Sequence, residues 1–328
     1  MKLTYLLGAL CAALSINAYA QAPIVIKFSH VVATDTPKGQ AAERFKQLAE
    51  KGTNGRVKVE LYPNSQLYKD KEELEALQLG AVQMLAPSLA KFGPLGVKEF
   101  EVFDLPYIFP SKAGLYRITE GPLGKSMLQK LETKGITGLA FWDNGFKSMS
   151  ANRPLHSPAD FRGLKMRIQS SKVLDAQMRA LGASPQVLAF SEVYQALQAG
   201  VVDGTENPPS NMYTQKMHEV QKHLTLTNHG YLGYAVIVNK KFWDGLPADL
   251  RSSLTAAMRE ASSYEKTIAQ RDNDAALERI RKSGKTTVYT PTAAEQAAFR
   301  AALAPVHRDM ESRIGKDLLG AIAREAAR

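Results

Sequence analysis

Arg167 carries the clearest chemical signal in the sequence. It lies in the segment 163–171, where apolar and polar residues alternate as in a strand with two unlike faces. Ser170 and Ser171 then suit the N-cap of a helix that ends near Gly182. A guanidinium at the carboxyl end of a strand, beside free helix N–H groups, is suited to bind an anion. A surface arginine on an edge strand would show the same pattern, which therefore leaves both interpretations open.

Complete catalytic motifs are absent from the sequence. The segment 121–126 resembles the end of a phosphate-binding loop, but Thr119 stands where the first glycine belongs, so a turn opening a helix is favoured. The chain has neither a Gly-x-Ser-x-Gly elbow nor a His-Glu-x-x-His motif. His218, His223 and His229 are spaced by five and six residues, which does not place them on one helical face. We interpret them as surface or packing histidines.

The acidic residues give no sign of an active site either. The neighbouring Glu72 and Glu73 fit the solvated face of a helix. Without a nucleophile–base pair or a set of metal ligands, nothing in the sequence requires an enzyme, and we expect no catalytic activity, no metal site and no cofactor.

The first 20 residues have the features of a signal peptide. Lys2 provides the positive start, residues 3–16 the apolar stretch, and Ala18-Tyr19-Ala20 a cleavage site after Ala20. The only cysteine, Cys11, lies inside this peptide. The mature protein would therefore be exported to the periplasm with no disulfide, thiolate metal site or cysteine nucleophile.

The chain is basic, with a formal net charge of +10. This excess could attract acidic solutes or an anionic surface, but a solvated basic surface would give the same composition. No segment pairs basic residues with aromatic ones as nucleic-acid-binding proteins do, so we expect no nucleic acid partner.

Strands and helices alternate along the mature chain. A strand–helix–strand–helix–strand order is expected first over residues 24–86 and again from residue 164. This order is typical of parallel sheets covered by helices, and its recurrence predicts two α/β lobes with a cleft between them. Residues 247–282 fit one unusually long helix, and Thr292 with Glu295 forms a capping box for another. The predicted segments are strands at 24–28, 56–62, 82–86, 164–168 and 186–190, and helices at 38–51, 73–78, 171–181 and 191–199.

Several segments together resemble the periplasmic solute-binding proteins of TRAP transporters (tripartite ATP-independent periplasmic systems), the DctP family. The resemblance covers nearly all of the mature chain and rests on a specific combination of motifs. The motifs lie at residues 61–67 (LYPNSQL), 142–147 (WDNGFK), 163–169 (GLKMRIQ), 181–185 (LGASP), 189–194 (AFSEVY) and 198–208 (QAGVVDGTENP).

The resemblance implies roles for individual residues. The arginine that binds the ligand carboxylate in this family falls on Arg167, and its asparagine neighbour on Asn207. A guanidinium matches a carboxylate at two points, and an amide can donate to the same oxygens. Phe190 would form an apolar wall, and Ser88 would line the cleft from the first lobe. Weaker candidates for the pocket are Gln169, Ser171 and Asn211.

Two lysines point to the class of ligand. In the sialic-acid branch an arginine stands at the position of Lys147, whereas the run 142–147 resembles the branch for C4-dicarboxylates. Lys38 matches a lysine of that same branch. Two cations facing Arg167 would suit a second carboxylate, although Lys38 could equally be solvated. Pro209 stands where many relatives have a larger side chain, which leaves the individual acid open.

These observations predict a two-lobed α/β periplasmic binding protein (type II-like) with a long helix spanning both lobes. The family places its crossovers near Asn144, near Leu232 and inside the long helix. The lobes would comprise residues 21–144 with 233–272, and 145–232 with 273–328.

The expected function is capture of an organic acid, above all a C4-dicarboxylate such as succinate, malate or fumarate, by a monomer. Delivery would be to the small and large membrane subunits of a TRAP transporter. The alternatives are another carboxylate (a 2-oxo, sugar or aromatic acid), an adaptor for a sensor kinase, or a periplasmic enzyme.

Overall fold

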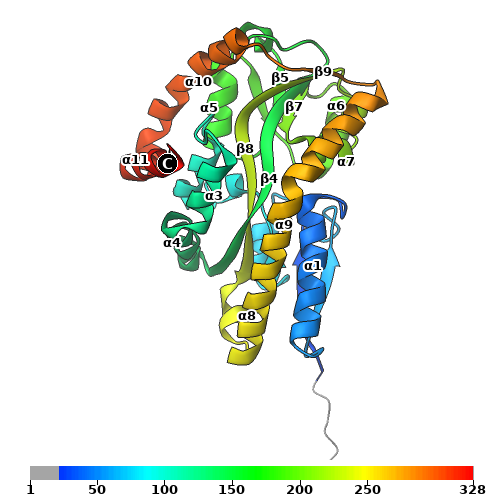
Figure 1. Cartoon of the computed structure of the whole chain (residues 1–328), viewed down its shortest axis with the longest axis vertical. Coiled ribbons are helices and arrows are strands. Elements are labelled where there is room, and N and C mark those ends of the chain that lie inside the picture. Colours follow the sequence, from blue (N-terminus) through cyan, green and yellow to red (C-terminus); the bar gives the residue numbers. More distant parts are fainter. Residues whose placement is uncertain (1–21, 328) are drawn as a thin grey trace, which may run out of the picture.

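The computed structural model describes residues 22–327, so the predicted signal peptide lies outside the described residues. The molecule is elongated, with two α/β halves stacked along its long axis (Figure 1). Among the described helices, none is both long enough and apolar enough to cross a membrane.

One sheet of nine strands passes through both halves of the described chain. Its order is β2-β1-β3-β8-β4-β7-β5-β6, with β9 beside β8. The strands are β1 (Ile24–Ser29), β2 (Val57–Tyr62), β3 (Met84–Leu85), β4 (Ile136–Ala151), β5 (Lys165–Ile168), β6 (Ser184–Val187), β7 (Gly204–Asn207), β8 (His223–Asn239) and β9 (Thr287–Tyr289).

The two predicted parallel units are present, but they are not separate sheets. Strand β1 pairs in parallel with β2 and β3, and β5 pairs in parallel with β6 and β7. The antiparallel strands β4 and β8, of 16 and 17 residues, join the two units. At about 3.3 Å per residue each spans roughly 50 Å. Because β4 and β8 extend through both halves, they turn two sheet units into one mixed sheet.

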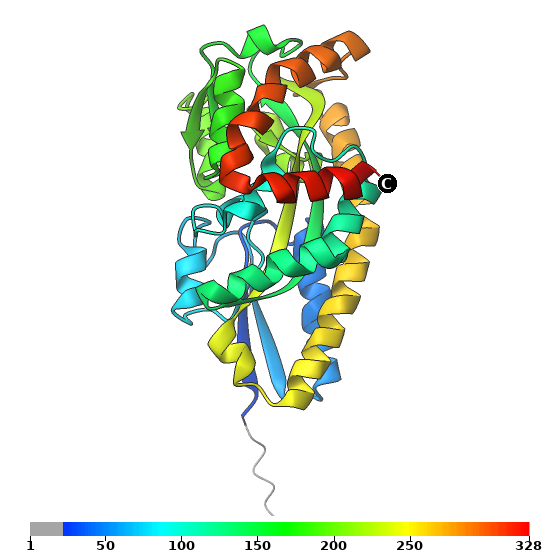
Figure 2. The ribbon, with the colours of Figure 1, turned by 90° about the vertical axis from the view of Figure 1, so that its left-hand side faces the viewer.

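The helices cover both faces of this sheet, and α9 runs along the whole molecule (Figure 1, Figure 2). This confirms the predicted long helix. The α-helices are α1 (Pro37–Gly52), α2 (Glu73–Gln78), α3 (Lys112–Glu120), α4 (Pro122–Lys130), α5 (Lys172–Ala180), α6 (Val193–Gln198), α7 (Pro209–Thr214), α8 (Lys240–Asp244), α9 (Ala248–Ser283), α10 (Ala293–Ile314) and α11 (Lys316–Ala327). The 3-10 helices are η1 (Leu89–Lys91), η2 (Lys98–Asp104), η3 (Leu131–Lys134), η4 (Pro158–Phe161), η5 (Phe190–Glu192) and η6 (Met217–Glu219).

Local signals in the sequence set several helix boundaries. The segment 121–126 opens α4, as predicted, and the Thr292 capping box opens α10. The side chain of Ser171 accepts a bond from the backbone of Leu174 and so caps α5. The strand expected at 186–190 is shorter, because β6 ends at Val187 and η5 begins three residues later.

Separate apolar clusters stabilise the two ends of the molecule. One packs β1, β2 and α1 against the first half of α9, and another packs α6 and α7 against the end of α9. The third and largest cluster joins the β4–β8 ribbon to η2, α5 and α10. Two of the clusters therefore lie at opposite ends, while the largest contains Leu77 and Leu85 of the first half together with Met166 and Leu174 of the second and is shared between the halves.

Strand β4 is irregular where it passes from one half to the other. Its pairing with β8 shifts register between Asp143 and Gly145. Gly145 has a backbone φ of +106°, a value that residues other than glycine rarely adopt. Asn273 of α9 donates to the Asn144 carbonyl at 2.7 Å and accepts from the backbone of Ser210 at 3.0 Å. Three elements thus meet at the expected crossover near Asn144, while the lobe boundaries themselves stay a prediction.

Candidate functional site

A narrow pocket lies between the two halves, beside β8. Its walls come from segments on both sides, and most of its lining groups are polar or charged. One side contributes Val31, Val32, Asp70, Glu73, Ser88 and Lys91, the other Arg167, Gln169, Phe190, Asn207 and Asn211, and β8 contributes Leu232 and Tyr234.

The pocket is nearly closed in this structure. Its free volume is about 20 Å³, enough for about one water molecule. A dicarboxylate can enter only if the two walls separate. Contacts across the mouth hold the walls together: the Phe190 N–H donates to Asp70 Oδ1 at 3.1 Å, and Lys69 Nζ lies 2.8 Å from Glu192 Oε1.

A larger groove of about 690 Å³ lies between α3, α4 and α9, but its chemistry does not suit an anion. Its buried acidic side chains are Asp143 and Glu265, whereas Lys125 and Arg259 on its rim are exposed. Asp143 is already paired with Lys112, and none of the basic side chains that line the groove is buried. The groove therefore offers no desolvated cation to an anion, and the narrow pocket with the buried Arg167 is the better candidate despite its smaller volume.

Arg167 is positioned at the end of β5 with its guanidinium held from one side. The side chain is 2% exposed, and its Nε and Nη2 donate to the Leu188 carbonyl at 3.1 and 2.8 Å. Its Cζ lies 5.8 Å from the centre of the Phe190 ring. Burial lowers the pKa of Arg167, and the charge of Asp70 opposes this shift. The guanidinium stays ionised because its ordinary pKa is so high.

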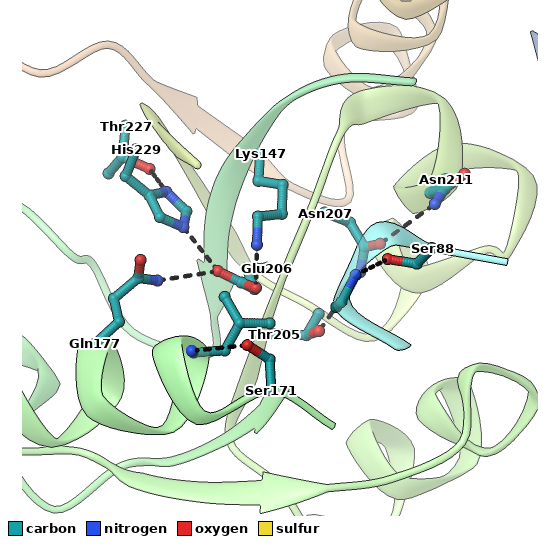
Figure 3. Close-up of polar contacts among 12 residues, drawn as sticks. Ser88, Lys147, Ser171, Gln177, Thr205, Glu206, Asn207, Asn211, Thr227 and His229 are labelled. Carbon is teal, nitrogen blue, oxygen red and sulfur yellow. Dashed lines mark hydrogen bonds and ion pairs between the residues drawn. The ribbon is translucent and has the colours of Figure 1, made fainter. Parts of the chain in front are cut away.

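Two asparagines stand beside Arg167 in the lining. Asn207 ends β7, and its Oδ1 accepts from Asn211 Nδ2 at 3.4 Å, as Figure 3 shows. Asn207 Nδ2 has only long contacts, at 3.5 Å to Thr205 Oγ1 and 3.7 Å to the sulfur of Met217. The Oδ1 of Asn211 is buried without a hydrogen-bond partner among the described residues. Both amides therefore have bonding capacity left for a ligand.

Three other predicted residues also line the pocket. Ser88 caps η1 and forms an isolated bridge with Tyr234, so it reaches the pocket from the first half. Phe190 contributes an apolar wall, and Gln169 lies two residues beyond Arg167. With Arg167, Asn207 and Asn211, the structure brings together six of the nine predicted site residues.

Lys147 does not lie where the sequence predicted. It is absent from the described lining and instead forms a buried ion pair, with Nζ 2.5 Å from Glu206 Oε1 (Figure 3). His229 Nε2 lies 2.8 Å from the other oxygen of Glu206, and Thr227 Oγ1 is 2.7 Å from His229 Nδ1. The charge of Lys147 is thus compensated by Glu206 in this structure, so Lys147 is not the free cation expected opposite Arg167.

The titration of this cluster follows from its contacts. Burial acts to raise the pKa of Glu206, but Lys147 and His229 outweigh it and hold the pKa at about 2. Burial lowers the pKa of His229. A neutral imidazole can donate from Nε2 to Glu206 while Nδ1 accepts from Thr227. His229 is thus a buried packing residue, in line with one of the two roles considered for it.

Lys38 and Ser171 lie outside the described lining of the pocket. Lys38 Nζ donates to the Ala86 carbonyl at 2.9 Å and stands 3.7 Å from the centre of the Tyr234 ring. Lys38 is 0% exposed, which excludes the solvated alternative. Ser171 is used as the cap of α5, so its hydroxyl is oriented toward the helix backbone.

The sequence interpretation missed three charged residues of the pocket. Asp70 and Lys91 form a buried ion pair at 2.6 Å. Burial acts to raise the pKa of Asp70, but Lys91 outweighs it and keeps that pKa below its ordinary value. Glu73 is 1% exposed and lines the pocket, so its assignment to a solvated helix face was wrong. Its neighbours Glu72 and Glu75 are exposed, whereas Ala76 and Leu77, three and four residues after Glu73, are buried with it. This helical spacing is the signal that could have placed Glu73 on the buried face.

The chain is similar to known proteins over almost its full length. Residues 28–313 match the family described as bacterial extracellular solute-binding protein, family 7. The chain is 68% identical, over 96% of its length and 94% of the relative, to the C4-dicarboxylate-binding periplasmic protein DctP of Rhodobacter capsulatus.

Solved structures agree with this match. A TRAP periplasmic solute-binding protein from Sulfurospirillum deleyianum with bound succinate is 46% identical, with a TM-score of 0.89 over 92% of this chain and 98% of that one. A TRAP solute-binding protein from Pseudomonas aeruginosa with bound L-malate is 44% identical, with a TM-score of 0.85 over 88% and 100%. The two-lobed α/β fold and the sequence together show that this chain belongs to the bacterial extracellular solute-binding proteins of family 7, the DctP family.

Proposed function

We propose that this protein captures a C4-dicarboxylate, such as succinate, malate or fumarate, in the pocket at Arg167. The observation that carries the proposal is a buried guanidinium which lines the pocket between the two halves from the end of a strand and pairs with no carboxylate among the described residues. A buried cation of this kind is stabilised by an anionic ligand. The relatives named for C4-dicarboxylates, and the neighbours with bound succinate and L-malate, support the same class.

The protein performs no chemical step on its ligand, since its family binds solutes for transport. We propose that Arg167 and Asn207 hold one carboxylate, with Asn211, Gln169 and Ser88 as further polar contacts. Phe190 would exclude water from one side, and this geometry strengthens the charged contacts.

We propose that the mature protein works in the periplasm after cleavage at Ala20 and delivers its ligand to the two membrane subunits of a TRAP transporter. The names of the relatives support this location and partnership. Closure of the two lobes would create the surface that those subunits recognise. The proposed lobes are the residue ranges predicted above.

Thermal-shift screening tests the ligand class directly. We expect succinate, malate or fumarate to raise the melting temperature of the mature protein more than matched monoacids, sugar acids or sialic acid do. A ligand at a hundredfold excess over its Kd adds about 2.7 kcal/mol to the free energy of unfolding, which amounts to a shift of a few degrees. If a sugar acid or an aromatic acid gives the largest shift while the C4-dicarboxylates give none, the proposed ligand class is wrong.

Ligand binding should also make the protein more compact. Because the pocket is lined from both halves, the ligand favours the form in which both walls touch it. Small-angle scattering should show a smaller radius of gyration with saturating succinate than without it. Trp142, whose Nε1 donates to Ser262 of α9 at 2.8 Å near the crossover, should report this movement by fluorescence. Trp142→Phe is the control, and an unchanged scattering profile with tightly bound succinate would contradict lobe closure.

A further inference from the structure

Glu73 is a pocket residue with unused bonding capacity. It lies at the start of α2, is 1% exposed and lines the pocket. Within the described part of the chain, its Oε1 is buried and has no hydrogen-bond partner. A buried carboxyl oxygen without a partner is costly, so a group that meets it on ligand binding would be stabilising.

Lys38 lies directly behind the same wall. Its ammonium is fully buried and is held by the Ala86 carbonyl and the face of Tyr234, another residue of the pocket lining. The charges of Lys38 and Glu73 interact with each other and with Asp70. An acid and a base thus adjoin one wall of the pocket.

The fixed charges around the pocket do not balance a dianion. Lys91 is compensated by Asp70, and Lys147 by Glu206. Arg167 donates only to a carbonyl in the described chain and therefore offers a single positive charge. If Lys38 and Glu73 are both ionised, their charges cancel and they add nothing to the net charge of the pocket. A ligand with two carboxylates would then bring one negative charge that no pocket cation compensates.

We propose that the Glu73–Lys38 pair takes up one proton from solvent when a dicarboxylate binds, so that the complex contains an ammonium at Lys38 and a neutral acid at Glu73. The pair then carries one positive charge and balances the second carboxylate, and the Glu73 hydroxyl can donate to a ligand oxygen. The inference rests on the proposed function, because it assumes a dianionic ligand.

The surroundings of the pair allow this change near neutral pH. Burial raises the pKa of Glu73 to about 7. The charges of Lys38 and Lys91 lower this pKa, and the charge of Asp70 raises it further. Burial lowers the pKa of Lys38 to about 7, against the charges of Glu73 and Asp70. At pH 7 and without ligand, the Lys38 amine and the Glu73 carboxyl group are therefore not both fully protonated.

The other titratable groups facing the pair do not compete for the proton. His30 of β1 stays neutral, because burial and then Lys38 lower its pKa to about 3. Burial raises the pKa of Tyr234 far above neutrality. Asp70 stays ionised, because Lys91 outweighs burial and keeps the pKa of that carboxyl below its ordinary value, and Arg167 keeps its charge. Linkage then requires that affinity for a fully ionised dicarboxylate falls with rising pH, up to tenfold per pH unit above about 7.

Calorimetric titration with fumarate, which is a dianion throughout this range, measures the proton directly. At pH 7 the binding enthalpy is recorded in several buffers that differ in their ionisation enthalpy. The slope of the observed binding enthalpy against the ionisation enthalpy of the buffer gives the number of protons taken up per ligand. We expect a slope above zero and of at most about one proton per fumarate, because one proton completes the pair. The double variant Lys38→Met with Glu73→Gln should bind more weakly and take up none. The control Lys51→Met with Glu75→Gln changes exposed residues on the same two helices and should match wild type.

Each outcome of these titrations either supports or overturns the proposed proton uptake. A zero slope for wild type, or the same slope in the double variant, overturns the inference. If the double variant fails to fold or bind, the wild-type affinity between pH 6 and 9 decides, because a flat profile excludes linked proton uptake. Binding without uptake would leave the proposed function intact, whereas an absence of heat with fumarate, succinate and malate would overturn the proposed function itself.

Discussion

Replacing Arg167 with Ala is expected to weaken the capture of C4-dicarboxylates severely. The ligand carboxylate would lose the one pocket cation that has no carboxylate partner in the described chain, at a cost of about 2–5 kcal/mol. Since each 1.4 kcal/mol is tenfold, Kd should rise at least about thirtyfold. Arg167→Lys should also bind poorly, because an ammonium cannot make the two-point contact. Isothermal titration with succinate and malate measures both losses.

A second arginine provides the matched control for this experiment. Arg179 lies on α5, is largely exposed and pairs only with Asp175 four residues before it. Arg179→Ala should therefore leave Kd unchanged. Melting curves without ligand show whether Arg167→Ala is still folded. A folded Arg167→Ala protein that binds within about threefold of wild type, well under 1.4 kcal/mol, would show that the site is elsewhere.

Lys147→Met should destabilise the fold instead of selecting between ligands. The substitution leaves Glu206, which is 4% exposed, as a buried carboxylate without its lysine. Breaking one side of a buried ion pair costs about 3–5 kcal/mol, a large part of the stability of an ordinary domain. Urea unfolding followed by circular dichroism should show a lower midpoint for Lys147→Met.

Two controls separate the buried pair from a general effect of losing a lysine. The double variant Lys147→Met with Glu206→Gln removes both charges and should recover most of the lost stability. Lys285 forms an exposed pair with Glu219, so Lys285→Met should cost less than about 1 kcal/mol. If Lys147→Met is as stable as wild type but loses only dicarboxylates, Lys147 is a ligand cation and the pair with Glu206 is incidental.

Much of the fold could be predicted from the sequence, because its signals are local. Alternating apolar residues marked the parallel strands on either side, and the long run without glycine or proline marked α9. Ser171 and Thr292 lie at helix starts because their hydroxyls accept from free backbone N–H groups. The family motifs located Arg167 and Asn207, and both line the pocket.

The charges of the pocket could not be predicted in this way, because they depend on contacts between distant segments. Lys147 and Glu206 are 59 residues apart, and they meet only because β4 and β7 pair in antiparallel register. Asp70, in the turn before α2, and Lys91, the last residue of η1, likewise meet only in the folded first half.

The sequence by itself therefore determined that this protein has two α/β halves and an arginine suited to an anion. Only the tertiary structure decided which cations are free to meet a ligand and which are already neutralised. The physical reason is that a buried charge is tolerated only when an opposite charge or hydrogen bonds compensate it. Folding decides which groups provide that compensation. Lys147 pairs with Glu206 and Lys91 pairs with Asp70, whereas the charge of Lys38 interacts with that of Glu73 beside the pocket.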